Sequence, residues 1–204
     1  MIPSSDIAFT PAVKAVQAAR GSRDAYVRME ARGGFRTEID ENLVGFLAQV
    51  DTAYLATANA AGQPYAQHRG GPKGFIRVVD EHTIGFADFT GNRQYVSTGN
   101  LAENDRAFLF LMDYAHRRRI KLWGRARVVD NDPGLLTRLM PEGYRARPEQ
   151  AILFKIEAWD SNCPQHIPQK FEAADVAAAM ARLEARIVTL EAENTQLKAE
   201  RNTP

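Results

Sequence analysis

The spacing of hydrophobic and polar positions changes three times along this chain. Residues 11–49 carry apolar side chains at helical spacing in two stretches that Gly33 and Gly34 separate, which predicts N-terminal helices. From Thr52 to about Asp160, short β-rich runs alternate with turn residues, as is typical of strands. Helical spacing returns over residues 176–197, which contain neither Gly nor Pro.

The middle region predicts six or seven short strands with few helices between them. Two of the strands are long and carry apolar residues on both faces, which favours a closed antiparallel barrel over a sandwich. One helical segment is expected at Tyr95 to Asn104. The predicted strands are Thr52–Ala58, Pro64–Arg69, Phe75–Val79, Thr83–Ala87, Ala107–Asp113, Ile120–Val129 and Ala151–Trp159.

The C-terminal helix predicts a parallel dimeric coiled coil. Its apolar residues follow a 4-3 repeat over about three heptads, and Asn194 occupies an a position, which favours two parallel strands in register. Charges at g and e′ have opposite signs in such a pair, Arg186 with Glu191 and Glu193 with Lys198. The alternative is one amphipathic helix packed on its own domain. The d positions are Val176, Leu183, Leu190 and Leu197, and the other a positions are Met180 and Ile187.

These patterns divide the 204 residues into two predicted domains, a mainly β domain with N-terminal helices over residues 1–171 and the C-terminal helix over residues 172–204. The chain is 45% hydrophobic and 25% charged, as in globular proteins with a core. No apolar run approaches the roughly 20 residues of a membrane span, and the N-terminus does not resemble a signal peptide. With a single cysteine, Cys163, we expect a cytoplasmic protein without an internal disulfide or a structural metal site.

The net charge of +1 hides a basic segment. Residues 69–127 hold 11 basic and 6 acidic residues, whereas the remainder of the chain carries a charge of −4. No aromatic residues are interleaved with the run Arg117–Lys121, so nucleic-acid binding is not expected. The alternation of that strand puts Arg119 and Lys121 on one face, and an exposed barrel rim is the simpler interpretation.

Two glycine-containing turns could bind an anion. The first is the stretch from Gln67 to Gly74, where Gly70 and Gly71 lie between the cations Arg69 and Lys73. It lacks the spacing of a Walker loop, and a plain strand connection with solvated charges is the alternative. The second turn begins at Asp88 and leads to the predicted helix, whose start favours anions. It supplies the donors Asn92, Arg93 and Gln94.

Taken together, the order of these motifs resembles the pyridoxamine 5′-phosphate oxidase-like family of FMN-binding split barrels. The resemblance covers about residues 43 to 160 and includes four stretches: Gly62–Tyr65, Gly91–Gln94, Asn100–Arg106 before Phe108–Phe110, and Arg119–Ala126. It implies a six-stranded antiparallel split β-barrel, an α+β protein, that forms a homodimer with FMN between the two subunits. Deazaflavin and haem are alternatives that relatives of the fold bind.

The resemblance also implies which residues contact the cofactor. The strand-two motif of the family falls on Gln67 to Pro72, with Arg69 and Lys73 displaced, and its Ser-Arg-Lys phosphate motif falls on Asn92, Arg93 and Gln94. Asp88 occupies the position of a hydroxyl residue near the flavin, and Arg119 matches a residue from the partner subunit. The expected cofactor-binding residues are therefore Gln67, His68, Arg69, Gly70, Gly71, Lys73, Asp88, Asn92, Arg93, Gln94 and Arg119.

The expected function is a flavin-dependent redox reaction on a small molecule, in which the protein positions the flavin. The C-terminal substrate-binding part of the true oxidase is not matched, so oxidation of pyridoxamine phosphate is not predicted. His68 and His166 are candidates for proton transfer, with a surface or structural histidine as the alternative. Cys163 and His166 lie in a loop that is expected to be structural and to close over the edge of the cofactor, with a thiolate–imidazole pair or a partial metal site as the alternatives. The alternative function is a non-catalytic flavin or haem carrier or sensor whose coiled coil docks on another protein.

Overall fold

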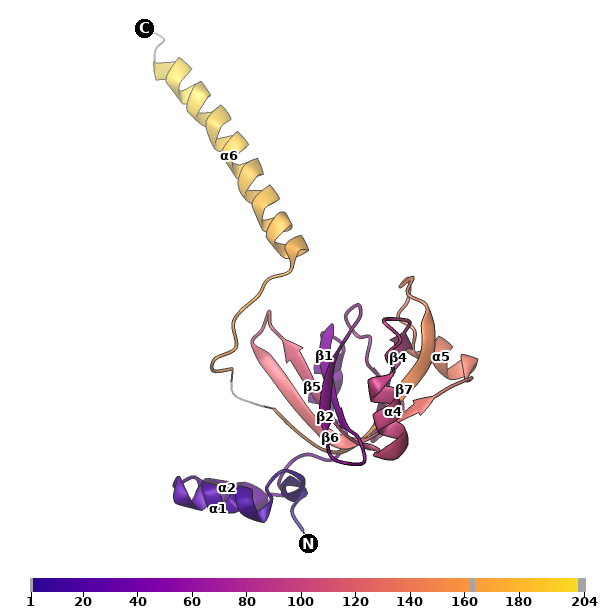
Figure 1. Ribbon diagram of the computed structural model, residues 1–204. Coiled ribbons are helices and arrows are strands. Elements are labelled where there is room, and N and C mark those ends of the chain that lie inside the picture. Colours follow the sequence, from indigo (N-terminus) through magenta and orange to yellow (C-terminus); the bar gives the residue numbers. More distant parts are fainter. Residues whose placement is uncertain (1, 162–163, 202–204) are drawn as a thin grey trace. The chain divides into compact units, whose positions relative to one another are not determined.

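The computed structural model describes residues 2–161 and 164–201 (Figure 1). These residues form one short 3-10 helix, six α-helices and seven β-strands. In chain order they are η1 (Ser4–Ile7), α1 (Pro11–Ala19), α2 (Arg23–Glu30), α3 (Glu41–Leu47), β1 (Thr52–Ala58), β2 (Pro64–Gly70), β3 (Arg77–Val78), β4 (Thr83–Phe89), α4 (Val96–Glu103), β5 (Arg106–Asp113), β6 (Arg118–Val129), α5 (Pro133–Leu139), β7 (Pro148–Ser161) and α6 (Ala173–Arg201).

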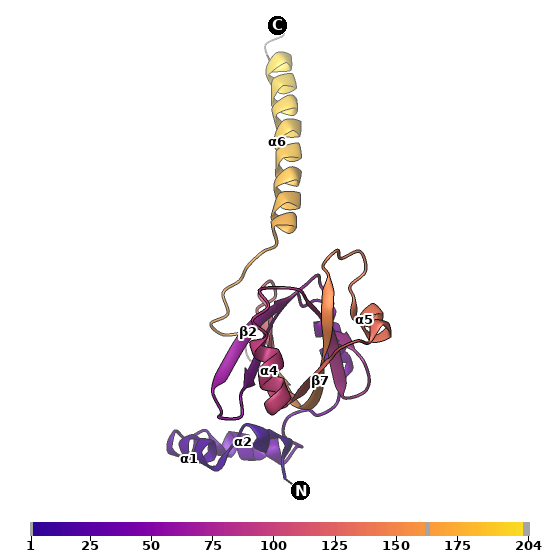
Figure 2. The same cartoon turned by 45° about the vertical axis from the view of Figure 1, so that its right-hand side comes forward.

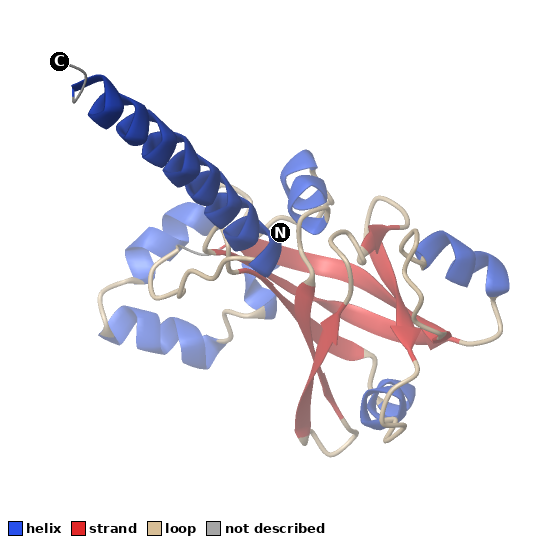
Figure 3. Cartoon of the chain, turned by 90° about the horizontal axis from the view of Figure 1, so that it is seen from above, coloured by secondary structure: helices blue, strands red, loops and turns tan. Residues whose placement is uncertain are grey.

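The strands, red in Figure 3, form one antiparallel sheet. Their order across the sheet is β2-β1-β5-β6-β7-β4-β3. The prediction of a mainly β, α+β protein is confirmed. The seven strands agree with the six or seven that the pattern predicted, but the closed barrel is wrong, because the edge strands β2 and β3 are not paired with each other, and the six strands that the resemblance implied are one too few. The sheet is therefore open.

An unpredicted helix covers the outer face of β7. The long strand β7 is buried on both faces over much of its length. One face contributes Ile152 and Phe154 to the main core, while the other packs Ala151 and Leu153 with Leu139 of α5. Apolar residues on both faces thus reflect a helix on the outer face and not a closed barrel. Helix α5 begins at Pro133, and the Asp132 carboxylate accepts a hydrogen bond from the Leu135 N–H at 2.8 Å.

The main core lies between α3 and the sheet. Leu43, Phe46 and Leu47 of α3 pack against buried residues of β1, β4, β5, β6 and β7. Asp40 caps this helix, since its Oδ1 accepts from the Leu43 N–H at 2.9 Å. Burial and hydrogen bonding cooperate here to fix the short helix, which would not be stable alone.

The N-terminal region forms two helices before α3 where the pattern predicted one stretch, because Gly21 adopts a left-handed conformation between α1 and α2. Phe35 follows them and stacks on Trp123 of β6 with 5.1 Å between ring centroids. The backbone of Arg36 pairs with Trp159 of β7, whose indole N–H donates to the Glu38 carbonyl at 2.8 Å. Trp123 and Trp159, each through its own contacts, therefore hold the N-terminal region to the sheet.

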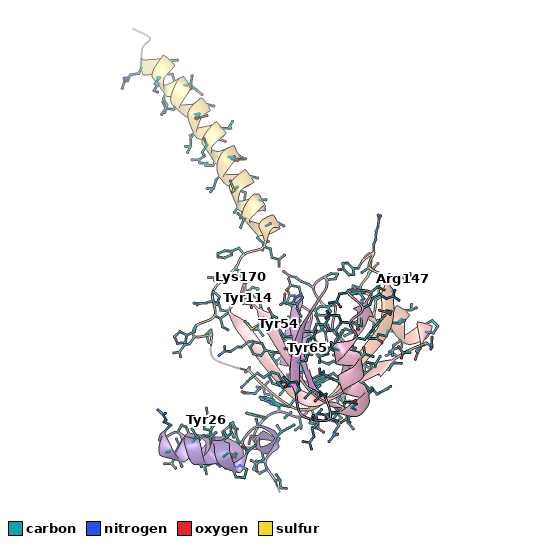
Figure 4. The ribbon with its side chains drawn as sticks, viewed as in Figure 1. Tyr26, Tyr54, Tyr65, Tyr114, Arg147 and Lys170 are labelled. Carbon is teal, nitrogen blue, oxygen red and sulfur yellow. The ribbon has the colours of Figure 1, made fainter. Side chains whose placement is uncertain are left out.

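The chain divides into two units, Met1–Asp113 with Arg118–Gln165, and Tyr114–Arg117 with His166–Pro204. In the second unit, the Lys170 ammonium lies 4.1 Å from the centre of the Tyr114 ring (Figure 4), and the Gln169 side chain donates to the Ala115 carbonyl at 2.9 Å. Helix α6 follows, and none of its residues is buried. The predicted domain boundary after Phe171 and the coiled coil stay predictions.

Among the described residues, no helix combines the length and apolar character that a membrane crossing requires. The same residues include no group of three or more His, Cys, Asp and Glu side chains placed to hold a metal ion.

Candidate cofactor site

The candidate site is built around an ion pair between strands that are not neighbours in the sheet. Arg69 near the end of β2 and Asp88 near the end of β4 form a close contact between Nη1 and Oδ1, and each side chain is only 12% exposed. The other terminal nitrogen of Arg69 donates to Oε1 of Gln67 at 3.0 Å. Asp88 was expected near a flavin; the structure pairs it with the Arg69 guanidinium.

Helix α4 joins this ion pair to the rest of the sheet. Ser97 is almost fully buried, and its hydroxyl donates to Oε1 of Gln67 at 3.1 Å. Gln150 of β7 is also buried, and its Nε2 donates to Oδ2 of Asp88 at 2.8 Å and to the Thr98 hydroxyl at 3.0 Å. Side chains of α4 thus bridge β2 and β7, between which the helix lies in Figure 2. We call the six residues Gln67, Arg69, Asp88, Ser97, Thr98 and Gln150 the polar seam.

The start of α4 faces a pocket. No side chain caps the backbone N–H groups at this end of the helix. The N-cap residue Tyr95 is in the left-handed region at φ 54°, and it makes no side-chain capping hydrogen bond. The first-turn N–H groups of a helix lack helical partners and favour an anion. Ser97 and Thr98, which belong to this first turn, line the pocket, whose volume is about 240 Å³.

Charge in the pocket is nearly balanced. The guanidinium of Arg93 donates from Nε to the Tyr95 hydroxyl at 3.2 Å, and that hydroxyl donates to Oε1 of Glu149 at 2.6 Å. The hydrogen bond to Tyr95 and the attraction of Tyr95 and Glu149 raise the pKa of Arg93, so it remains a cation. Arg69 is neutralised by Asp88, which leaves Arg93 as the cation best placed to meet an anion at the start of α4.

A second pocket of about 180 Å³ adjoins the first, with which it shares Gln67, Arg69, Asp88 and Phe89. It extends the site toward His68 and Gly70, and the His68 ring meets Tyr54 edge to face at 5.6 Å. Between the two pockets, Nε of Arg69 is buried without a hydrogen-bond partner. A buried donor without a partner costs stability, and a ligand acceptor would satisfy it.

The predicted residues are only partly brought together. Gln67, Arg69, Asp88, Asn92 and Arg93 line the first pocket, and His68 and Gly70 line the second. Gly71, Lys73, Gln94 and Arg119 line neither of the two. His166 belongs to the second unit, and Cys163 lies outside the described residues.

The glycines of the first turn have a structural reason to be glycine. A Cβ on Gly71 would lie 2.7 Å from Cβ of Phe75, and one on Gly70 would lie 3.3 Å from the Asp51 carbonyl oxygen. Internal packing therefore accounts for both, whereas a Cβ on Gly91 in the first pocket would make only an ordinary contact, 3.9 Å from the Phe89 carbonyl oxygen. The close packing of Gly70 and Gly71 therefore does not itself indicate an anion site at this turn.

Sequence reasoning missed Ser97, Thr98, Gln150, Tyr95 and Glu149. Gln150 directly precedes a run of four apolar residues in β7. A polar side chain within a strand that is otherwise apolar is the one feature of the sequence that could have identified it. The others lie in or beside segments whose partners are far away in the sequence. Only the fold brings them together.

The open antiparallel sheet and its covering helices define an α+β protein whose candidate site is a charged pocket at the uncapped start of α4. The model of the pyridoxamine 5′-phosphate oxidase family matches residues 39–163, and the chain belongs to this family. A search of the curated proteins finds no match.

Solved structures with the same fold include HupZ of Group A Streptococcus, which is 16% identical, with a TM-score of 0.50 over 65% of this chain and 99% of that chain. An FMN-binding protein from Syntrophomonas wolfei is 12% identical, with a TM-score of 0.46 over 72% and 97%. HutZ, the haem storage protein from Vibrio cholerae, is 15% identical, with a TM-score of 0.44 over 59% and 92%.

Proposed function

We propose that this protein binds FMN and is a flavin-dependent oxidoreductase acting on a small molecule. The observation that carries the proposal is the uncapped start of α4, which opens into a pocket beside the Arg93 cation. A phosphate monoester suits this set of donors, because it carries up to two negative charges and accepts several hydrogen bonds. FMN supplies such a phosphate, and membership of the family supports it.

The residues of the two pockets fit the cofactor in charge and in hydrogen bonding. Arg93 and the first turn of α4 would hold the phosphate, with Asn92 beside them. Gln67 and the unpartnered Nε of Arg69 would face polar atoms of the cofactor. When bound, FMN supplies an isoalloxazine that accepts or donates a hydride.

Proton transfer at the site falls to His68 in this proposal. His68 lines the second pocket next to Arg69 and is exposed to solvent, so it can exchange protons with water. His166 is the second candidate. We further propose a homodimer that shares the cofactor between subunits, with Arg119 of one chain reaching the site of the other.

A flavin titration tests the proposal. Wild-type protein is expected to quench FMN fluorescence on binding, and Arg93→Ala is expected to weaken the affinity about tenfold, or about 1.4 kcal/mol. Arg77→Ala is the matched control, since Arg77 is exposed on β3 and lines neither pocket. Equal affinities for wild type and Arg93→Ala would exclude the phosphate site, and no binding at all would exclude the FMN proposal.

The exposed helix α6 favours a second candidate function, a non-catalytic carrier or sensor of flavin or haem that docks through α6. For the oxidoreductase, deazaflavin is the alternative cofactor to FMN. Protein loaded with FMN separates the two functions, because an oxidoreductase is reduced by a nicotinamide donor and reoxidised by a substrate. A Soret band in the purified protein would instead support haem.

A further inference from the structure

Helix α6 presents a continuous apolar stripe that the other residues of its own unit do not cover. Six large hydrophobic residues of the stripe are between 45% and 65% exposed: Val176, Met180, Leu183, Ile187, Leu190 and Leu197. The helix is 29 residues long, which corresponds to about 43 Å at 1.5 Å per residue. Isolated helices gain little stability in water, and an uncovered stripe of this length is unfavourable.

The stripe has the period of a two-stranded coiled coil. Its members are spaced by four and three residues from Val176 to Leu197, with Asn194 completing the series at an a position. A strict a/d seam is narrower than the face that a helix lays on a globular core. The polar Asn194 within the seam finds its hydrogen-bond partner in the same residue of an identical helix in register.

The charges beside the seam complement a second copy of the same helix. Arg186 at g and Glu191 at e′ have opposite signs, as do Glu193 at g and Lys198 at e′. Each pair forms twice in a symmetric parallel dimer. The hydrogen bonds found within α6 at this end, such as that from Gln196 to Glu200, lie outside the seam and leave it available.

We propose that α6 pairs with α6 of a second copy of this chain as a parallel, in-register coiled coil over Val176–Leu197. The proposal rests on the exposed stripe, on its period and on the complementary charges, and it does not depend on which cofactor the first unit binds. It assigns the C-terminal helix an interface of its own, separate from any contact between the sheets of two subunits.

Cysteine cross-linking of the full-length chain tests both the interface and its direction. In a Cys163→Ser background, Met180→Cys and Leu197→Cys place single thiols at the two ends of the seam, and Ala192→Cys places one on the opposite face at f. Under a mild oxidant, Met180→Cys and Leu197→Cys are each expected to form self-disulfides at least about tenfold faster than Ala192→Cys. Only at seam positions are the Cα atoms of two paired helices close enough for a disulfide to join their cysteines. Equal rates at all three positions would overturn the coiled coil.

The direction of the pair is read from a mixture of two variants. A parallel pair cross-links each seam variant with itself, whereas an antiparallel pair forms disulfides mainly between Met180→Cys and Leu197→Cys chains. The second result would overturn the parallel arrangement.

A charge placed in the seam provides an independent measurement. Adding Ile187→Lys to the Leu197→Cys chain is expected to abolish the fast cross-linking, whereas Val188→Lys, at the neighbouring b position, is expected to leave it unchanged. Val188 is 66% exposed and apolar, so it is a matched control for hydrophobicity and position. Equal effects of the two lysines would contradict the seam. Circular dichroism and the cofactor content of each variant confirm that the first unit is folded.

Discussion

Arg69 of β2 and Asp88 of β4 are joined by a largely buried ion pair, although their strands lie five places apart in the sheet. A closed barrel would join its end strands by backbone hydrogen bonds. Here the side chains of Arg69, Asp88, Gln150 and Ser97 make the connection instead. The polar seam thus brings the two ends of an open sheet into contact, and it does so next to the pocket that we assign to a cofactor.

Removing the carboxylate from this pair is expected to destabilise the fold. Asp88→Asn leaves the buried Arg69 guanidinium without a counter-charge, which typically costs about 3 kcal/mol in the free energy of unfolding. Asp160→Asn is the control, because its ion pair with Lys121, at 3.0 Å, is more exposed and is worth at most about 1 kcal/mol. Urea unfolding measures the free energy of unfolding of the two variants. Equal losses of stability would show that Arg69 and Asp88 do not act as a buried ion pair.

Gly71 is expected to matter for stability and not for cofactor affinity. In Gly71→Ala the new Cβ meets Phe75 at 2.7 Å, and the overlap should lower the free energy of unfolding by about 2 kcal/mol. Gly91→Ala, whose new Cβ would meet only the Phe89 carbonyl oxygen at an ordinary contact distance of 3.9 Å, should change it by less than about 0.5 kcal/mol. If FMN titration of folded Gly71→Ala protein reveals a large loss of affinity while stability is unchanged, the turn at Gly70–Gly71 is the phosphate site after all.

Gly124 lies where β6 and β7 change register, and a side chain there is expected to disrupt the sheet. A Cβ on Gly124 would overlap the carbonyl oxygen of Lys155, which is backbone and cannot rotate away. Gly124→Ala should therefore cost about 3 kcal/mol or more. Gly99→Ala in α4, with no atom near the new Cβ, should instead gain up to about 1 kcal/mol from helix propensity. Thermal unfolding compares the two variants, and similar melting temperatures would contradict the close approach.

Asp40 is expected to contribute a pH-dependent term to stability. Partial burial opposes the charge, but hydrogen bonds from Leu43 and Asn42 and the nearby Arg36 outweigh it, so the pKa of Asp40 is lowered in the folded state. Because the folded pKa lies below the unfolded one, this stability is complete above the unfolded pKa and is lost as pH falls through the folded pKa.

Two substitutions separate the cap of α3 from its charge. Asp40→Ala should lower stability by about 1 kcal/mol at neutral pH, and by less at about pH 3. Asp40→Asn retains an acceptor for the Leu43 N–H and should lose part of the pH dependence. Unfolding curves at the two pH values measure both effects, and a constant loss for Asp40→Ala would exclude the titrating cap.

The strands could be predicted because burial alternates along them. In β1 every second residue from Ala53 to Thr57 is buried, and the predicted bounds Thr52 to Ala58 match. Closure could not be predicted, since apolar residues on both faces of a long strand, as in β5 and β6, are equally consistent with a barrel or with other segments that cover the outer face. The Asp132-Pro133 start of α5 was a readable signal for that helix.

The candidate site was predictable in its parts but not in its pairing. Gln67, Arg69, Asp88 and Arg93 were singled out by their places at strand ends and beside glycines, and all four line the first pocket. That Arg69 and Asp88 neutralise each other depends on the curvature of the whole sheet, which no local pattern contains. Ser97 and Gln150 had the same disadvantage, because their partners are 30 and 62 residues away.

The position of the polar seam affects how the protein can evolve. Its groups come from edge strand β2, from β4, from α4 and, through Gln150, from β7, whereas the pairing of β1, β5 and β6 depends on other residues. Substitutions in the polar seam can therefore reshape the pocket without altering the register of the central strands β1, β5 and β6. A change of ligand in a descendant of this chain would require a few new side chains and no new fold.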